Sequence, residues 1–169
     1  MAELELVLGG TRSGKSRFAL ARASALGGDR VTFVATARAG DEELDARIAD
    51  HRRARPAAWR TVEVDGDLAA AVASADPAHV VLLDSLTLWL SARLEASTSP
   101  ESEWAAVAKA IEKRALAVIV VSDEVGLGIV PATPIGRRFR DELGKLNQAV
   151  ARDAGSVVLM VAGLPVPLK

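Results

Sequence analysis

The sequence reads Gly9-Gly10-Thr11-Arg12-Ser13-Gly14-Lys15-Ser16 near its N-terminus, and this stretch matches the phosphate-binding loop pattern G-x-x-x-x-G-K-[ST] at every fixed position. The mostly apolar run 4–8 before it predicts a buried strand, and the residues after it predict a helix. A glycine-containing loop between a strand and a helix N-terminus presents backbone N–H groups to phosphate oxygens. A chance match in a glycine-rich turn would not account for both flanks. The stretch therefore predicts a site for Mg²⁺ and a nucleoside triphosphate.

Two side chains of this loop have predicted roles in that site. Lys15 is expected to reach the β- and γ-phosphates as a point charge, and the Ser16 hydroxyl is expected to ligate Mg²⁺. Both expectations follow from the chemistry of the motif.

Composition excludes several other classes of protein. The chain has 169 residues, 21 basic and 22 acidic side chains, a net charge of −1 and no cysteine. Neither nucleic acid nor a membrane is therefore an expected partner, and no disulfide, thiolate metal site or cysteine nucleophile can form. No apolar run approaches the length of a membrane-spanning helix. We expect a soluble, cytoplasmic protein.

Apolar runs alternate regularly with helical stretches along the whole chain. Most of the runs are continuous, as expected for strands buried on both faces of a parallel sheet. No linker or repeat interrupts them, so residues 1–169 are expected to form a single nucleotide-binding α/β domain with helices on both faces of the sheet. The predicted strands are 4–8, 31–35, 59–64, 80–84, 117–122 and 156–162, and the predicted helices are 14–26, 41–54, 66–75, 86–95, 101–116 and 134–153.

Two segments are expected at sheet edges. Run 59–64 alternates in polarity, which indicates a strand that is less completely buried. The C-terminal segment 163–168 contains two prolines, so it is expected to be extended and at an edge.

Acidic residues end two of the predicted strands, where a parallel sheet binds its ligands. Asp84 follows an apolar run and is predicted to hold Mg²⁺ directly or through water, with capping of the next helix as the alternative. Asp123 and Glu124 follow another run. Asp123 is expected in a solvated turn, whereas Glu124 is left open between that role and a role as base or metal partner. The irregular loop after them is expected to cover the site.

The predicted helix 41–54 has an unusual basic end. Arg47, His51 and Arg55 are four residues apart and share one helix face. Neighbouring positive charge favours neutral, nucleophilic imidazole at His51, and the arginines would suit phosphate oxygens. From these residues alone, a solvated basic face is the preferred interpretation.

The sequence resembles the bifunctional adenosylcobinamide kinase and adenosylcobinamide-phosphate guanylyltransferase family of cobalamin biosynthesis. The resemblance extends over essentially the whole length, and two segments are more specific than the phosphate-binding loop. They are His51-Arg52-Arg53-Ala54-Arg55-Pro56 and Glu124-Val125-Gly126-Leu127-Gly128-Ile129-Val130-Pro131.

The resemblance implies two reactions. A nucleoside triphosphate, GTP or ATP, donates its γ-phosphate to the hydroxyl of adenosylcobinamide. GTP then guanylylates a histidine, which by its position in the motif is His51, and the phosphorylated cobinamide takes the GMP. A histidine intermediate divides one difficult transfer into two easier steps.

The resemblance also implies a set of site residues, a fold and an assembly. Catalysis is assigned to His51 and Lys15, and the metal to Ser16 and Asp84. The implied fold is a mostly parallel sheet of the phosphate-loop NTPase kind with one antiparallel strand, for which 163–168 is the candidate, and the implied assembly is a homotrimer. The predicted nucleotide-binding residues are Gly9, Gly10, Thr11, Arg12, Ser13, Gly14, Lys15, Ser16, Ala35, Thr36, Ala37, Arg52, Arg53, Ala54, Arg55, Glu63 and Asp84.

Two other functions use the same loop. One is a simple small-molecule kinase in which the His51 helix is only charged, and the other is a nucleotide-switch ATPase or GTPase that acts on a protein partner. Covalent labelling at His51 separates the first from the bifunctional enzyme, and stimulation by cobinamide separates the second.

Overall fold

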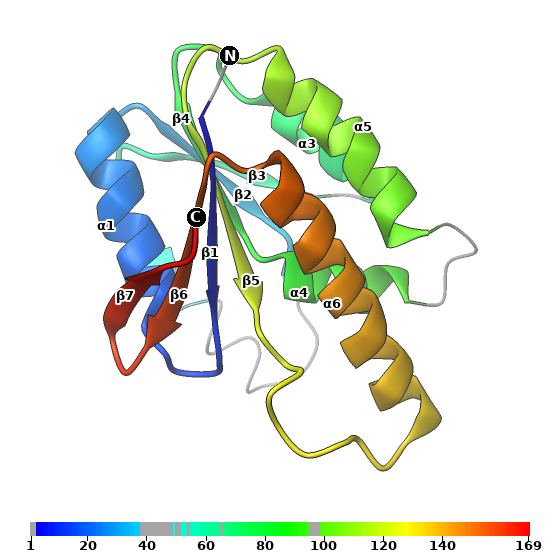
Figure 1. Cartoon of the computed structure of the whole chain (residues 1–169). Helices are drawn as coiled ribbons and strands as arrows, with labels where there is room; N and C mark the ends of the chain where they lie inside the picture. The colour runs from blue at the N-terminus through cyan, green and yellow to red at the C-terminus, as the bar shows by residue number, and fades with distance from the viewer. Residues whose placement is uncertain (1–2, 38–48, 50–51, 54, 65, 95–98) are drawn as a thin grey trace.

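The sheet that organises the molecule contains seven strands in the order β3-β2-β4-β5-β1-β6-β7 (Figure 1). The computed structural model describes residues 3–37, 49, 52–53, 55–64, 66–94 and 99–169. All neighbouring strands are parallel except β6 and β7, which are antiparallel. The strands are β1 Leu4–Gly9, β2 Val31–Ala35, β3 Arg60–Glu63, β4 Val80–Asp84, β5 Val118–Asp123, β6 Ser156–Val161 and β7 Leu164–Pro167.

Helices cover both faces of this sheet, as the alternating pattern predicts. Helix α1 packs on one face, where Ala19 and Ala23 join the buried residues Val7, Leu82 and Val121. The other helices pack on the opposite face, because alternate residues of each strand point to opposite sides. The helices are α1 Lys15–Gly27, α3 Leu68–Ser74, α4 Leu86–Arg93, α5 Pro100–Glu112 and α6 Pro134–Asp153.

Both predictions of edge segments are confirmed. Strand β3 occupies one edge and β7 the other, and β7 is the antiparallel strand. Proline is tolerated in β7 because an edge strand needs only part of its backbone N–H groups for pairing.

The predicted elements agree with the observed ones except at their boundaries. Predicted strand 59–64 shortens to β3, and predicted helix 101–116 ends at Glu112 in α5. Predicted helix 41–54 lies mainly outside the described residues, of which 49, 52 and 53 are helical. Among the helices that the structure describes, none is long and apolar enough to cross a membrane.

The strand order has one consequence for the site. Strand β5 lies between β1, which leads into the phosphate-binding loop, and β4, which ends in Asp84. The register pairs Gly9 with Asp123, so the carboxylate on the strand directly beside the loop is Asp123. Asp84, which sequence reasoning places beside the loop, is one strand farther away.

Candidate active site

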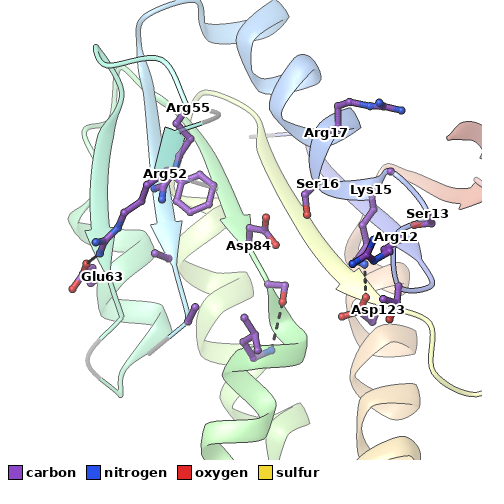
Figure 2. A pocket seen from close by; sticks show the side chains of 17 residues that line it. Arg12, Ser13, Lys15, Ser16, Arg17, Arg52, Arg55, Glu63, Asp84 and Asp123 are labelled. Carbon is purple, nitrogen blue, oxygen red and sulfur yellow. Dashed lines mark hydrogen bonds and ion pairs between the residues drawn. The ribbon is translucent and has the colours of Figure 1, made fainter. Parts of the chain in front are cut away.

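A pocket of about 540 Å³ lies where the carboxyl ends of the central strands meet the phosphate-binding loop (Figure 2). Its volume is within the range of ordinary small-molecule sites. Residues from β2, β4, β5, α1 and the segment before β3 contribute to its walls. The lining residues are Thr11, Arg12, Ser13, Gly14, Lys15, Ser16, Arg17, Phe33, Ala35, Ala37, Arg52, Arg55, Glu63, Asp84, Ser85, Leu88 and Asp123.

The phosphate-binding loop has the backbone geometry that its sequence predicts. Gly14 is the N-cap of α1 with a φ of 95°, a left-handed conformation that suits glycine. Because Gly14 has no side chain that could cap this helix, the N-cap residue leaves the first N–H groups of α1 to phosphate oxygens. The Gly163 N–H donates to the Ser13 carbonyl at 2.9 Å, which braces the loop against the turn between β6 and β7.

Lys15 and Asp123 form an ion pair inside the pocket (Figure 2). The Lys15 ammonium also donates to the Gly10 carbonyl at 3.2 Å. The expectation of a solvated turn at Asp123 is therefore wrong. This carboxylate lines the pocket and contacts the lysine of the loop, because β5 is the neighbour of β1 in the sheet.

Asp84 and Ser16 line the same pocket, and the alternative role of Asp84 as a helix cap is not observed. Ser85 is the N-cap of α4, and its hydroxyl accepts from the Leu88 N–H at 3.5 Å. A hydroxyl and a carboxylate are oxygen donors of the kind that Mg²⁺ prefers when phosphates and water complete its coordination. In the described part of the chain no cluster of three or more His, Cys, Asp or Glu side chains could hold a metal by itself. The donors fit a metal that arrives with a nucleotide.

Two arginines face the pocket from the segment before β3. Arg52 donates to Glu63 Oε1 at 2.6 Å, and Arg55 donates to the Thr61 hydroxyl at 3.1 Å. The Arg55 guanidinium also lies 3.9 Å from the centre of the Phe33 ring, a cation–π contact. Burial, followed by the positive charge of Arg52, lowers the pKa of Arg55, while the charges of Asp84 and Glu63 oppose this. Arginine nevertheless stays protonated in proteins, so the pocket keeps a positive charge here.

Most of the predicted site residues that the structure describes come together in this pocket. Gly9, Gly10, Thr36 and Arg53 do not line it, although Gly9 and Gly10 begin the loop. The Thr36 hydroxyl is buried and donates to the Ser85 carbonyl at 2.7 Å, which ties the end of β2 to the start of α4. His51 and Ala54 lie outside the described residues.

Sequence reasoning missed five residues that line the pocket. They are Arg17, Phe33, Ser85, Leu88 and Asp123. Asp123 had a signal, its place at the end of a buried strand, but the sequence does not say which strand neighbours the loop. The positions of the other four residues in the pocket are set by tertiary packing alone.

Comparison with known proteins confirms the family resemblance found in the sequence. Residues 5–168 match the family model described as cobinamide kinase / cobinamide phosphate guanyltransferase. A bifunctional adenosylcobalamin biosynthesis protein, CobP of Pseudomonas aeruginosa, is 45% identical over 98% of this chain and 96% of its own length. CobU of Salmonella typhimurium is 39% identical, with 97% of this chain and 98% of the relative covered.

Solved structures confirm the fold. The ATPase domain of G40P superimposes with a TM-score of 0.54 at 17% identity and covers 93% of this chain and 68% of that chain. The flagellar accessory protein FlaH of Methanocaldococcus jannaschii gives 0.55 at 13% identity, with 99% and 78% covered. At these identities the likeness shows a common phosphate-loop NTPase architecture. The family match over nearly the whole sequence, together with the two relatives, establishes that the chain belongs to the cobinamide kinase / cobinamide phosphate guanyltransferase family and is an enzyme of that bifunctional class.

Proposed function

We propose that the enzyme phosphorylates adenosylcobinamide and then transfers GMP from GTP to the product through a guanylyl-histidine at His51. The observation that carries this proposal is the position of Arg52 and Arg55, which line the same pocket as the phosphate-binding loop. In the sequence Arg52 directly follows His51. A histidine in this segment is therefore within a short length of chain of the phosphates that the loop would bind.

The loop residues would act on either triphosphate. Lys15 places a positive charge near the β- and γ-phosphates, and the free N–H groups at the start of α1 bind their oxygens. Ser16 and Asp84 would hold Mg²⁺, which when bound neutralises phosphate charge and aids departure of the leaving group. The roles that the sequence predicts for the other nucleotide-binding residues are also part of this proposal.

The arginines would act on the guanylyl group. Arg52 and Arg55 present planar guanidinium groups, which can donate two parallel hydrogen bonds to a phosphate. Attack of a neutral imidazole nitrogen on the α-phosphorus forms the N–P bond and breaks the bond to pyrophosphate. A phosphate oxygen of the phosphorylated cobinamide then attacks the same phosphorus, the N–P bond breaks and the imidazole leaves.

The substrate is proposed as a corrinoid, a large molecule that needs an open approach to the pocket. The homotrimer implied by the family resemblance stays a prediction, and light scattering on the purified protein measures it. The relative kcat/KM values of ATP and GTP in the phosphorylation reaction would show which nucleotide is the phosphate donor.

Labelling with GTP tests the covalent step. The protein is incubated with GTP radioactive at the α-phosphorus or at the γ-phosphorus and is then denatured and separated on a gel. Acid-labile, base-stable label from the α-position alone, absent in His51→Ala, is the expected result. If the wild-type enzyme binds GTP but takes no label, the covalent role of His51 is wrong and the simple kinase replaces it.

A further inference from the structure

Asp123 is the carboxylate closest in the sheet to the phosphate-binding loop, and neither reaction described above uses it. Its strand pairs with β1, and the register sets it opposite Gly9. Its carboxylate contacts the Lys15 ammonium. Because Lys15 of this motif engages the terminal phosphates of a nucleotide, Asp123 lies next to the position of the γ-phosphate.

Three elements hold the Asp123 backbone in place. Its N–H donates to the Thr87 hydroxyl of α4 at 2.9 Å, and its carbonyl accepts from the amide nitrogen of Asn147 of α6 at 3.0 Å. The next N–H, that of Glu124, donates to the Gly9 carbonyl at 3.1 Å. The bond to Gly9 continues the pairing of β1 with β5, and the contacts with Thr87 and Asn147 add support from two helices. They orient one side chain towards the pocket.

The neighbouring carboxylate does not share this position. Glu124 Oε1 accepts from the Gly126 N–H at 2.6 Å and so turns into its own loop. Glu124 is also absent from the residues that line the pocket, whereas Asp123 is among them. This difference makes Glu124 a matched control for Asp123.

Nucleotide binding is expected to separate the Asp123 carboxylate from the Lys15 ammonium. In the described part of the chain its ion-pair partner is Lys15, and Lys15 is expected to turn to the phosphates. A carboxylate left beside the γ-phosphate would oppose nucleotide binding by charge repulsion. Such an unfavourable group is expected only if it has a function in the reaction.

We propose that Asp123 is the catalytic base of the phosphorylation reaction. The cobinamide hydroxyl oxygen attacks the γ-phosphorus, the bond between that phosphorus and the β–γ bridging oxygen breaks, and the nucleoside diphosphate leaves. The hydroxyl proton passes to the Asp123 carboxylate. Lys15 exchanges Asp123 for phosphate when the nucleotide binds, and this frees the carboxylate to accept the proton.

The two reactions differ in their need for this base. A hydroxyl nucleophile carries a proton that must leave, whereas a neutral imidazole attacks through a free electron pair. Loss of the Asp123 carboxylate should therefore slow phosphorylation much more than guanylylation. This contrast depends on the guanylyl-histidine proposed above.

The test compares Asp123→Asn with Glu124→Gln in three measurements. These are the Kd of GTP, the kcat of cobinamide phosphorylation and the rate of protein labelling from α-labelled GTP. For Asp123→Asn we expect kcat to fall on the order of 10²–10⁴-fold. Labelling should change less than threefold, and the Kd should be unchanged or lower. Glu124→Gln should match the wild-type enzyme in all three measurements.

Other outcomes would overturn the inference. If phosphorylation and labelling fall by the same factor, Asp123 acts only by positioning Lys15. If phosphorylation is unchanged, Asp123 has no part in it. A wild-type enzyme that binds GTP but takes no label would instead reject His51, and kcat against Kd would still test Asp123. Asp123→Glu, which keeps a carboxylate, should recover part of the lost rate, and circular dichroism checks that each variant folds.

Discussion

The pocket has two walls that are built in different ways. The loop wall consists of Gly14, Lys15, Ser16 and Asp123, and it rests on the central strands β1 and β5. The arginine wall consists of Arg52, Arg55 and Glu63, and it rests on the edge strand β3. The side chains of Lys15 and Asp123 are 13% and 21% exposed, whereas those of Arg52 and Glu63 are 59% and 68% exposed.

This difference separates what must be rigid from what can adjust. The loop wall is supported by buried strands on both sides and by the brace between Ser13 and Gly163, so it is suited to hold the phosphates of a nucleotide in one place. In the arginine wall, Arg55 contacts Phe33 and Thr61. Arg52 and Glu63, by contrast, are joined by an exposed ion pair, which contributes little to stability. Arg52 and Glu63 can therefore move at small energetic cost, as two successive transfers at one site would require.

The largest effect is expected at the charge of the loop wall. Lys15→Ala should lower both phosphorylation and guanylyl transfer at least 10³-fold, because both reactions need the triphosphate to be neutralised. Rates with saturating GTP and cobinamide measure this, and Lys145→Ala, which removes an exposed lysine on α6, is the control. An unchanged rate in one of the two reactions would show that Lys15 does not serve a common triphosphate site.

The backbone of the loop wall should come next. A Cβ at Gly9 would lie 2.3 Å from the Ser13 hydroxyl and 3.0 Å from the Met160 carbonyl. We expect Gly9→Ala to lower the free energy of unfolding by about 1–3 kcal/mol. For a chain of this length, each kcal/mol corresponds to about 2–4 °C in Tm. Thermal unfolding measures the loss.

Gly10→Ala is the matched control for that variant. A Cβ at Gly10 has no atom within 4 Å, so the melting temperature should stay near the wild-type value. Equal melting temperatures for the two variants would contradict the tight support that we assign to the loop wall.

A smaller effect is expected at Arg55, the half-buried residue of the arginine wall. Arg55→Lys removes the planar group over Phe33 and its hydrogen bond to Thr61, at a cost of about 1 kcal/mol in the free energy of unfolding. The loss is measured by urea denaturation. A larger loss than for Gly9→Ala would reverse the comparison between the walls.

The smallest effect is expected at the exposed ion pair. A double-mutant cycle with Arg52→Gln and Glu63→Gln should give a coupling of about 0.2–1 kcal/mol in the free energy of unfolding. High salt should reduce this coupling, because both side chains are exposed. A coupling of several kcal/mol would mean that the arginine wall is as rigid as the loop wall.

The sequence predicted most residues of the loop wall but only some of the residues around it. The phosphate-binding motif predicts the strand, the glycine turn at Gly14 and the helix that follows, because these features depend on residues close together in the sequence. Sequence reasoning misplaced Asp123, because contact with Lys15 requires β5 to lie beside β1, which no local pattern states. It gave capping of the next helix only as the alternative role of Asp84, and the adjacent Ser85 performs that role.

The sequence by itself determined the elements, their alternation, the two edge segments and the phosphate-binding loop, because each depends on periodicity or backbone preference over a few residues. It also carried the motifs that identify the family. The tertiary structure decided the strand order, the pairing of Lys15 with Asp123 and the contrast between the two walls. These depend on which buried faces pack together, and that choice is made by long-range burial of apolar surface rather than by any local stretch of sequence.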